Sequence, residues 1–279
     1  MVRIITDTTS SIPSRIAQEL SIPYFPQIII FGEDSFRDDN EIDTETFLKK
    51  FRSFQGVPKT AAPAPALYNP VFKEILDQGD SIIVICPSAE LSGTVRSAET
   101  AAAEFPGGDI RVIDSRSIGS GLGSIVFEAV RMAKEGADAD TIAKKALELS
   151  QKNRVYFVVD TLEYLHRGGR IGGAQALFGS LLQIKPILSL KDGRTVPVET
   201  QRTKKNAQSR LREIIEKDCP HNPSSHLTLM QGDAMEDAIR FRDEIQNTKG
   251  FTDIPIYELP PAVLVHTGPG VLAASFFVD

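Results

Sequence analysis

Short apolar runs alternate with longer amphipathic ones through the first half of the chain. Near-continuous apolar runs at residues 2–6, 81–86 and 110–114 predict strands that are buried on both faces. A polar loop at 7–11 leads to a helix with Pro13 near its first position, and residues 23–31 are expected to be extended. Apolar positions at helical spacing predict helices at 44–54, 67–77, within 89–104, 117–134 and 140–151. This alternation is typical of a largely parallel sheet covered by helices.

The second half has a different pattern of apolar and polar residues, which predicts antiparallel strand pairing. Strands are expected at 155–159, 226–232, 254–259 and 262–266, the last leading into a Gly-Pro turn, and helices at 162–167, 174–184, 204–217 and 235–246. Asp192-Gly193 lies between two β-prone runs and predicts a hairpin turn. The fold class is therefore α/β with two domains. We expect the boundary near Lys152, with a parallel α/β/α sheet domain at 1–152 and a mixed or antiparallel α/β domain at 153–279.

Composition narrows the class of protein further. The chain has 279 residues, 41% apolar and 24% charged, so each half can bury a core. No apolar run is long enough to cross a bilayer, and the N-terminus enters a strand without a signal-peptide segment. Cys86 and Cys219 lie far apart, without the spacing of metal ligands. A reduced, cytoplasmic protein without a metal site is expected. The net charge of −6 argues against nucleic acid as its main partner.

Charge is unevenly distributed along the chain. The segment 167–212 holds ten basic residues and only two acids, a local charge of +8, which leaves −14 for the remainder. Solvated surface would explain most of these side chains. The bias in an otherwise acidic protein also suggests a docking face for an anion or an acidic protein.

Three hydroxyl-bearing loops, at 6–11, 59–63 and 88–94, follow or lie near the apolar strands. In open α/β sheets, ligands collect where the loops at the carboxyl ends of strands converge. Ser92-Gly93-Thr94 is the most informative of these sequences, because it opens a helix whose free backbone amides favour an anion. Ser92 has an equally plain alternative role as the cap of that helix.

The stretch DTLEYLHRGGRIGG at 160–173 carries two glycine pairs that enclose Arg170 and Ile171. It lacks the frame of a phosphate-binding loop and is interpreted as a helix stop and restart, with Arg170 on an exposed turn. The phrase resembles the signature of the DegV family of bacterial fatty-acid-binding proteins. Further motifs in the order expected for that family are SGT at 92–94, Lys-Thr-x-x-Pro around Thr60, VIDS at 112–115 and HTGPG at 266–270.

The resemblance implies a binding protein without catalytic residues of its own. It implies that Thr60, Ser92 and His266 hold the carboxylate of a long-chain fatty acid such as palmitate, with no cofactor. Here Ala61 and Ala62 follow Thr60, where the family usually has a serine. The partner implied is the ATP-binding subunit of a fatty acid kinase, which forms an acyl phosphate that a downstream acyltransferase uses in phospholipid synthesis. Arg170 and Arg202 are then candidates for partner docking or phosphotransfer support.

Two other functions stay open on the sequence. One is a Ser92/His266 hydrolase or small-molecule transferase, although no G-x-S-x-G motif surrounds Ser92. The other is a sensor of a different small acid, whose basic segment contacts a regulator. A lone histidine such as His266 is more often structural, and only the resemblance favours a functional role. Burying about fourteen methylenes at ~0.8 kcal/mol each would contribute on the order of 11 kcal/mol, before the cost of association.

Overall fold

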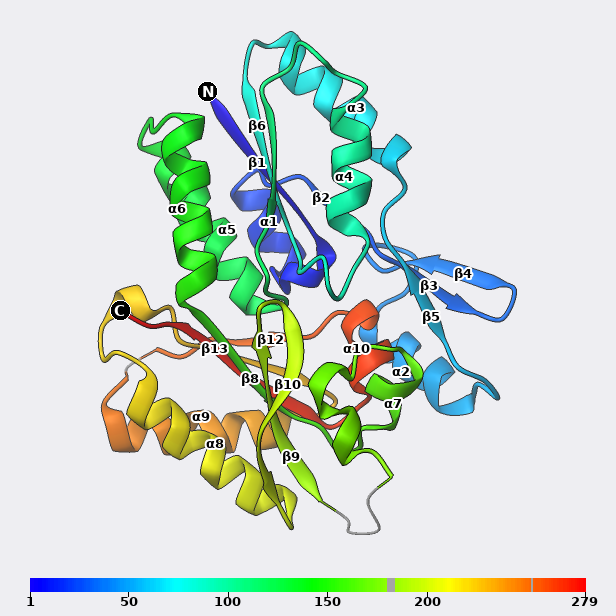
Figure 1. The fold of residues 1–279 in the computed structure, drawn as a ribbon, viewed down its shortest axis with the longest axis vertical. Helices are drawn as coiled ribbons and strands as arrows, with labels where there is room; N and C mark the ends of the chain where they lie inside the picture. Colours follow the sequence, from blue (N-terminus) through cyan, green and yellow to red (C-terminus); the bar gives the residue numbers. More distant parts are fainter. Residues whose placement is uncertain (180–183, 252) are drawn as a thin grey trace.

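Sheets of different pairing occupy the two halves of the chain (Figure 1). The structure is a computed structural model that describes residues 1–179, 184–251 and 253–279. The first half contains an all-parallel sheet in the order β2-β1-β6-β7. Its strands are β1 (Val2–Asp7), β2 (Tyr24–Phe25), β6 (Ser81–Cys86) and β7 (Ile110–Asp114). The parallel sheet predicted from the near-continuous apolar runs is confirmed.

Helices cover both faces of the parallel sheet. They are α1 (Ser14–Glu19), α3 (Pro65–Asp77), α4 (Thr94–Ala102), α5 (Ser120–Lys134) and α6 (Ala139–Lys152). Successive β-strand residues point to opposite faces, so Ile83 packs with α5 and α6 whereas Ile82 packs with α3 and α4. Both residues are fully buried. Burial on both faces explains why these strands are apolar without alternation.

The second half builds a mixed sheet in the order β10-β9-β8-β13-β11-β12. Its strands are β8 (Asn153–Val158), β9 (Lys185–Lys191), β10 (Arg194–Gln201), β11 (Thr228–Gly232), β12 (Ile256–Glu258) and β13 (Val271–Phe277). All neighbours are antiparallel except β11 and β12. Helices α8 (Lys204–Asp218) and α9 (Met235–Lys249) pack on one face. The α/β class and the hairpin at Asp192-Gly193 are therefore confirmed.

A small third sheet, β4-β3-β5, joins the halves. Its antiparallel strands are β3 (Ile28–Phe31), β4 (Asp34–Arg37) and β5 (Lys59–Ala61), and α2 (Thr44–Ser53) lies beside it. The sequence predicted only an extended segment and two loops here, because β4 is polar and β5 is very short. Phe31 and Phe47 share one core with Phe157 of the second half. Since this core crosses Lys152, the domain boundary at that residue stays a prediction.

Two sequence predictions near the C-terminus and the signature were wrong. Residues 261–267 form helix α10 (Pro261–Thr267), not a strand: Pro261 suits the first turn of a helix, and Gly268 ends it with φ of 72°. After α7 (Glu163–Arg167), the expected helix at 174–184 is replaced by a short 3-10 helix, Gly172–Leu177. The remainder of that prediction, at 180–183, lies outside the described residues. Within the described ranges, no helix is long and apolar enough to span a membrane.

Candidate functional site

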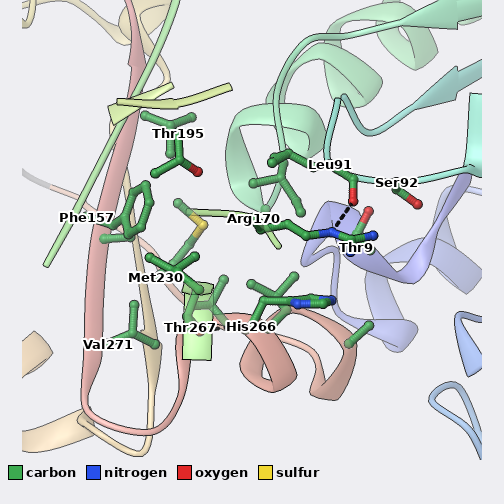
Figure 2. Close-up of a pocket in the computed structure, with 18 of the residues that line it drawn as sticks. Thr9, Leu91, Ser92, Phe157, Arg170, Thr195, Met230, His266, Thr267 and Val271 are labelled. Carbon is green, nitrogen blue, oxygen red and sulfur yellow. Dashed lines mark hydrogen bonds between the residues drawn. The ribbon is translucent and has the colours of Figure 1, made fainter. Parts of the chain in front are cut away.

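A pocket lies between the six-stranded sheet and the loops of the first half (Figure 2). The sheet supplies an apolar wall through side chains of β8, β9, β11 and β13. These side chains are Val155, Phe157, Leu190, Met230, Val271 and Ala273. Further apolar residues come from α7, from α10, and from the segments just before α10 and α5, namely Leu165, Ala262, Val263, Leu259, Ile118 and Gly119. Most of the side chains that line the pocket are therefore apolar and suited to contact a hydrocarbon chain.

Strand alternation decides which residues reach the pocket. Phe157 faces the pocket, while its neighbours Tyr156 and Val158 pack toward α8 and α9 on the opposite face. Both faces of β8 are apolar because one meets helices and the other meets the pocket. The sequence pattern predicted this strand but gave no sign that one of its faces lines a cavity.

Polar groups from both halves gather at the side of the pocket that faces the loops of the first half. Thr60, Ser92, Arg170 and His266 all line it, together with Thr9 and Gln27. Thr60 Oγ1 lies 2.9 Å from His266 Nε2, although the two residues are 206 positions apart in sequence. Figure 2 shows Arg170, Ser92, Thr9 and His266 at one end and Phe157, Met230 and Val271 at the other. The arrangement matches an amphipathic ligand with one polar end.

The imidazole of His266 is partly buried and neutral. Burial, reinforced by the positive charge of Arg170, lowers the pKa of His266 from 6.5 to about 4. Its Nδ1 atom is buried without a hydrogen-bond partner among the described residues and lies against Gly168, where an added Cβ would approach Nδ1 to 2.2 Å. We therefore assign the proton to Nε2, which donates to Thr60 Oγ1. The Thr60 hydroxyl is then free to donate its own hydrogen to a ligand.

Arg170 is not on an exposed turn, as its glycine-rich surroundings suggested. It is partly buried, and the main chain holds its guanidinium: Nε donates to Leu91 O at 2.9 Å and Nη1 donates to Gly168 O at 2.7 Å. Burial lowers the pKa of Arg170 below its ordinary value, but an arginine keeps its charge at neutral pH. The bond to Leu91 ties the signature turn to the loop after β6 (Figure 2). The residue thus brings positive charge to the polar end of the pocket.

Ser92 lies next to the start of α4 without being its cap. The cap position belongs to Gly93, and no side chain caps the helix. Ser92 Oγ instead lies 2.9 Å from Thr94 Oγ1 and accepts a long bond of 3.3 Å from Thr94 N. Because Ser92 also lines the pocket, the helix-cap alternative does not account for it.

Arg202 lies outside this group of residues. It is exposed just after β10 and does not line the pocket. Much of the positive charge of the basic segment 167–212 is also neutralised by neighbouring acids, because six of its ten basic side chains form ion pairs. These six are Arg167, Lys185, Arg194, Lys204, Arg210 and Arg212. In the described part of the chain, Arg202, Lys191 and Lys205 form no such pair, so any docking face is smaller than the sequence suggested.

Several site residues escaped the sequence analysis. Gln27 is buried and lines the pocket, and a polar residue inside the apolar run PYFPQIIIF was an available signal. Asp7 and Thr9 belong to a loop whose hydroxyls were noted but given no role. Gly168 permits the close approach of His266, and Thr195 contributes a buried hydroxyl from β10. Gly168 belongs to the first glycine pair of the signature, but nothing in the sequence indicates its contact with His266, and Thr195 carries no local sequence signal.

The hydrolase alternative finds little support in this geometry. A serine nucleophile needs a histidine within hydrogen-bond reach, and that histidine needs a third group to orient it. His266 bonds Thr60, Ser92 bonds Thr94, and Nδ1 of His266 has no carboxylate partner in the described residues. The same part of the chain contains no group of three or more His, Cys, Asp or Glu side chains that could hold a metal ion.

The fold and pocket define an α/β protein whose largely apolar pocket ends in a cluster of hydroxyl, imidazole and guanidinium groups. The chain belongs to the DegV family, whose model, described as that of an uncharacterised protein family, matches residues 1–279. A DegV domain-containing protein from Streptomyces coelicolor is 36% identical over 275 residues, covering 97% of this chain and 96% of its own length.

Solved structures in the family agree with the fold. A DegV family protein from Thermus thermophilus, described as binding fatty acid, has a TM-score of 0.90 at 30% identity and covers 100% of this chain and 99% of its own. DegV from Bacillus subtilis, described as a fatty acid binding protein, has a TM-score of 0.87 at 28% identity with coverage of 100% and 99%.

Proposed function

We propose that this protein binds a long-chain fatty acid such as palmitate in the pocket and presents its carboxyl group to a separate ATP-dependent fatty acid kinase subunit. The observation that carries the first part is the pocket itself, in which an apolar wall meets a polar end formed by Thr60, Ser92, Arg170 and His266. Fatty acid binding by the Thermus thermophilus and Bacillus subtilis relatives supports the same ligand class.

The apolar wall supplies the main driving force in this proposal. Each methylene transferred from water contributes ~0.8 kcal/mol, so a sixteen-carbon chain gains on the order of 11 kcal/mol before the cost of association. Phe157, Met230 and Val271 would contact this hydrocarbon. A ligand held by such a gain leaves slowly, so protein purified from a bacterial host is expected to retain fatty acid.

The polar end compensates for burying a carboxylate, which would otherwise cost several kcal/mol. With His266 donating to Thr60, the Thr60 hydroxyl can donate to a carboxylate oxygen, and the Ser92 hydroxyl can donate to the other. Arg170 adds a positive charge at the same end. The absence of a serine after Thr60 leaves these groups, rather than a neighbouring hydroxyl, to hold the ligand.

Binding is tested by extracting lipid from purified protein and by titrating delipidated protein with palmitate. We expect about one fatty acid per chain, and we expect Thr60→Ala and Ser92→Ala each to cost roughly 1–3 kcal/mol of binding free energy. Val198→Ala, an exposed change on β10, serves as the matched control because Val198 does not line the pocket. Well-folded protein that neither carries nor binds fatty acid would refute the proposal.

Delivery to the kinase is the second part. An oxygen of the bound carboxylate attacks the γ-phosphorus of ATP, the bond to the bridging oxygen breaks, and ADP leaves with acyl phosphate formed. An acyltransferase would then use the acyl phosphate in phospholipid synthesis. Arg202 is exposed and outside the pocket, so we assign it to partner docking. Arg170 lines the pocket, so we assign it to the carboxyl and to the transferring phosphate.

These two assignments predict different outcomes in a system reconstituted with the kinase subunit. Arg202→Ala should lower acyl phosphate formation while bound fatty acid stays normal, whereas Arg170→Ala should lower both. Lys191→Ala is the control, since Lys191 is another exposed basic residue outside the pocket. Equal activity of the Arg202→Ala and Lys191→Ala proteins would remove Arg202 from the docking surface.

A further inference from the structure

A buried chain of hydrogen bonds leads from Asp7 to Ser92. Asp7 Oδ1 accepts from Thr9 N at 2.9 Å and from the Thr9 hydroxyl, and Asp7 Oδ2 accepts from Gln27 Nε2 at 2.7 Å. The second hydrogen of Gln27 Nε2 goes to Thr94 Oγ1 at 3.0 Å. Thr94 Oγ1 in turn lies 2.9 Å from Ser92 Oγ. Ser92 and Gln27 line the pocket, whereas Asp7 and Thr94 lie behind them.

Among the described residues, no cationic side chain pairs with the carboxylate of Asp7 at the far end of this chain. Asp7 is 1% exposed, and burial raises its pKa from 3.8 to about 6 despite its donors. Other titratable groups near Asp7 come from three further elements, namely Asp38 after β4, Tyr68 of α3 and Cys86 of β6. Burial and the charge of Asp7 raise the pKa of Asp38 to about 7. Asp38 Oδ1 accepts from the Thr8 hydroxyl and from Gln27 N, and neither of these bonds involves Thr94 or Ser92.

The donors and acceptors along the chain link the proton on Asp7 to the direction of the Ser92 hydroxyl. An ionised Asp7 only accepts, and the Thr94 hydroxyl is among the neighbouring groups whose hydrogen bonding to this carboxylate lowers the pKa of Asp7, so the Thr94 hydrogen points toward Asp7. Thr94 Oγ1 then has one lone pair taken by Gln27 and the other open to Ser92. Ser92 already accepts from Thr94 N, so its own hydrogen goes to Thr94 and away from the pocket.

A protonated Asp7 reverses this order. Its proton is donated to Thr94 Oγ1, which already accepts from Gln27, so both lone pairs of that oxygen are used. The Thr94 hydroxyl must then donate to Ser92 Oγ, and the Ser92 hydrogen is left to donate into the pocket. A carboxylate ligand needs that donor. It also gains from the loss of the negative charge on Asp7.

We propose that Asp7, Gln27 and Thr94 form a positioning network that turns the Ser92 hydroxyl into the pocket when Asp7 takes up a proton, so that the pocket binds a fatty acid anion together with one proton. This inference rests on the proposed fatty acid site and deepens it, because it names the residues that set the direction in which the Ser92 hydroxyl donates its hydrogen. Asp7 and Thr94 are positioning residues, because they act on the ligand through Ser92.

The test measures palmitate affinity of delipidated protein between pH 5 and 8, by displacement of a fluorescent fatty acid analogue. We expect the wild-type affinity to rise about tenfold as the pH falls through about 6, the pKa of Asp7. Asp7→Asn keeps the shape of the side chain, although its amide nitrogen cannot accept from Gln27 Nε2 as Asp7 Oδ2 does, and it should bind with a smaller dependence on pH. Asp38→Asn removes the neighbouring, partly buried acid and serves as the comparison for effects of charge alone.

A double-mutant cycle isolates the network from every other titrating group. The effect of Asp7→Asn should shrink by at least about threefold in a Ser92→Ala background, whereas that of Asp38→Asn should be the same in both backgrounds. If Asp7→Asn fails to fold, Thr94→Val replaces it, and Thr94→Ser, which restores the hydroxyl, should recover the pH dependence.

The outcomes separate the two proposals. Wild-type protein that does not bind palmitate at any pH contradicts the proposed function itself. If the wild-type protein binds palmitate but Ser92→Ala leaves the effect of Asp7→Asn unchanged, the network is refuted and the fatty acid site stands. The same conclusion follows if the pH dependence of binding persists in Thr94→Val.

Discussion

Replacing Gly168 by alanine tests whether the glycine-rich signature serves the pocket by letting His266 approach. An added Cβ would lie 2.2 Å from His266 Nδ1 and 3.1 Å from Tyr164 O. Ordinary van der Waals contact needs more than 3.4 Å, so the imidazole must move by about 1 Å. The hydrogen bond from Nε2 to Thr60 Oγ1 is 2.9 Å long, and a shift of that size is enough to break it.

The expected cost has two parts that separate experiments measure. Overpacking should lower the free energy of unfolding by roughly 1–3 kcal/mol, measured by urea denaturation. Loss of the Thr60–His266 bond should weaken palmitate binding by roughly 1 kcal/mol, because the Thr60 hydroxyl is then no longer held in place. Gly169→Ala is the matched control: φ at Gly169 is +70°, but no atom of the described residues lies within 4 Å of its added Cβ. It should lose stability through backbone strain and keep its affinity.

A second background identifies the clashing partner. In a His266→Ala protein the imidazole is gone, so Gly168→Ala should cost less stability than in the wild type, whereas the effect of Gly169→Ala should be unchanged. If Gly168→Ala binds palmitate like the wild type, or costs the same with and without His266, the close approach does not explain the glycine.

Two further predictions concern His266 and the hairpin. Folding lowers the pKa of His266 from 6.5 to about 4, so the free energy of unfolding should fall by at most about 3 kcal/mol as the pH drops from 6.5 toward 4. In the absence of ligand, His266→Gln should lack this dependence of the unfolding free energy on pH. Parallel pH curves for the two proteins would contradict the assignment. Gly193→Ala should lower the melting temperature more than Gly136→Ala. Both glycines have positive φ, but only at Gly193 would the added Cβ clash with Ser88 Oγ, at 2.3 Å. Equal melting temperatures would refute this contact.

Repeating patterns allowed much of the fold to be predicted. The strands Val2–Asp7 and Ser81–Cys86 are apolar throughout because helices bury both of their faces, and that requirement is visible in the sequence. Helix α10 is the instructive failure. Its apolar residues are buried all round, so no polar stripe marks a helical period, and a short apolar run is then indistinguishable from a strand.

The candidate site was predictable only where a motif carried it. Thr60, Ser92 and His266 came from motifs in their expected order, and all three line one pocket. Arg170 was predicted on an exposed turn but is partly buried, because its exposure depends on contacts between distant segments that no local sequence pattern encodes. Its guanidinium is held by Leu91 O, a main-chain atom 79 positions away. Main-chain partners leave no trace in the residue types, so such contacts are invisible to sequence reasoning.

The loop between β6 and α4 explains why the site needs both halves of the chain. Ser88 donates to Gly193 O at 2.8 Å, Glu90 pairs with Arg194, and Leu91 O accepts from Arg170. All three contacts join this loop to the second half, and Ser92 follows directly with its hydroxyl at the pocket. The second half therefore sets the position of a donor that the first half supplies. A change that breaks one of these three contacts should consequently alter ligand affinity through Ser92, even where the altered residue, such as Arg194, lies outside the pocket.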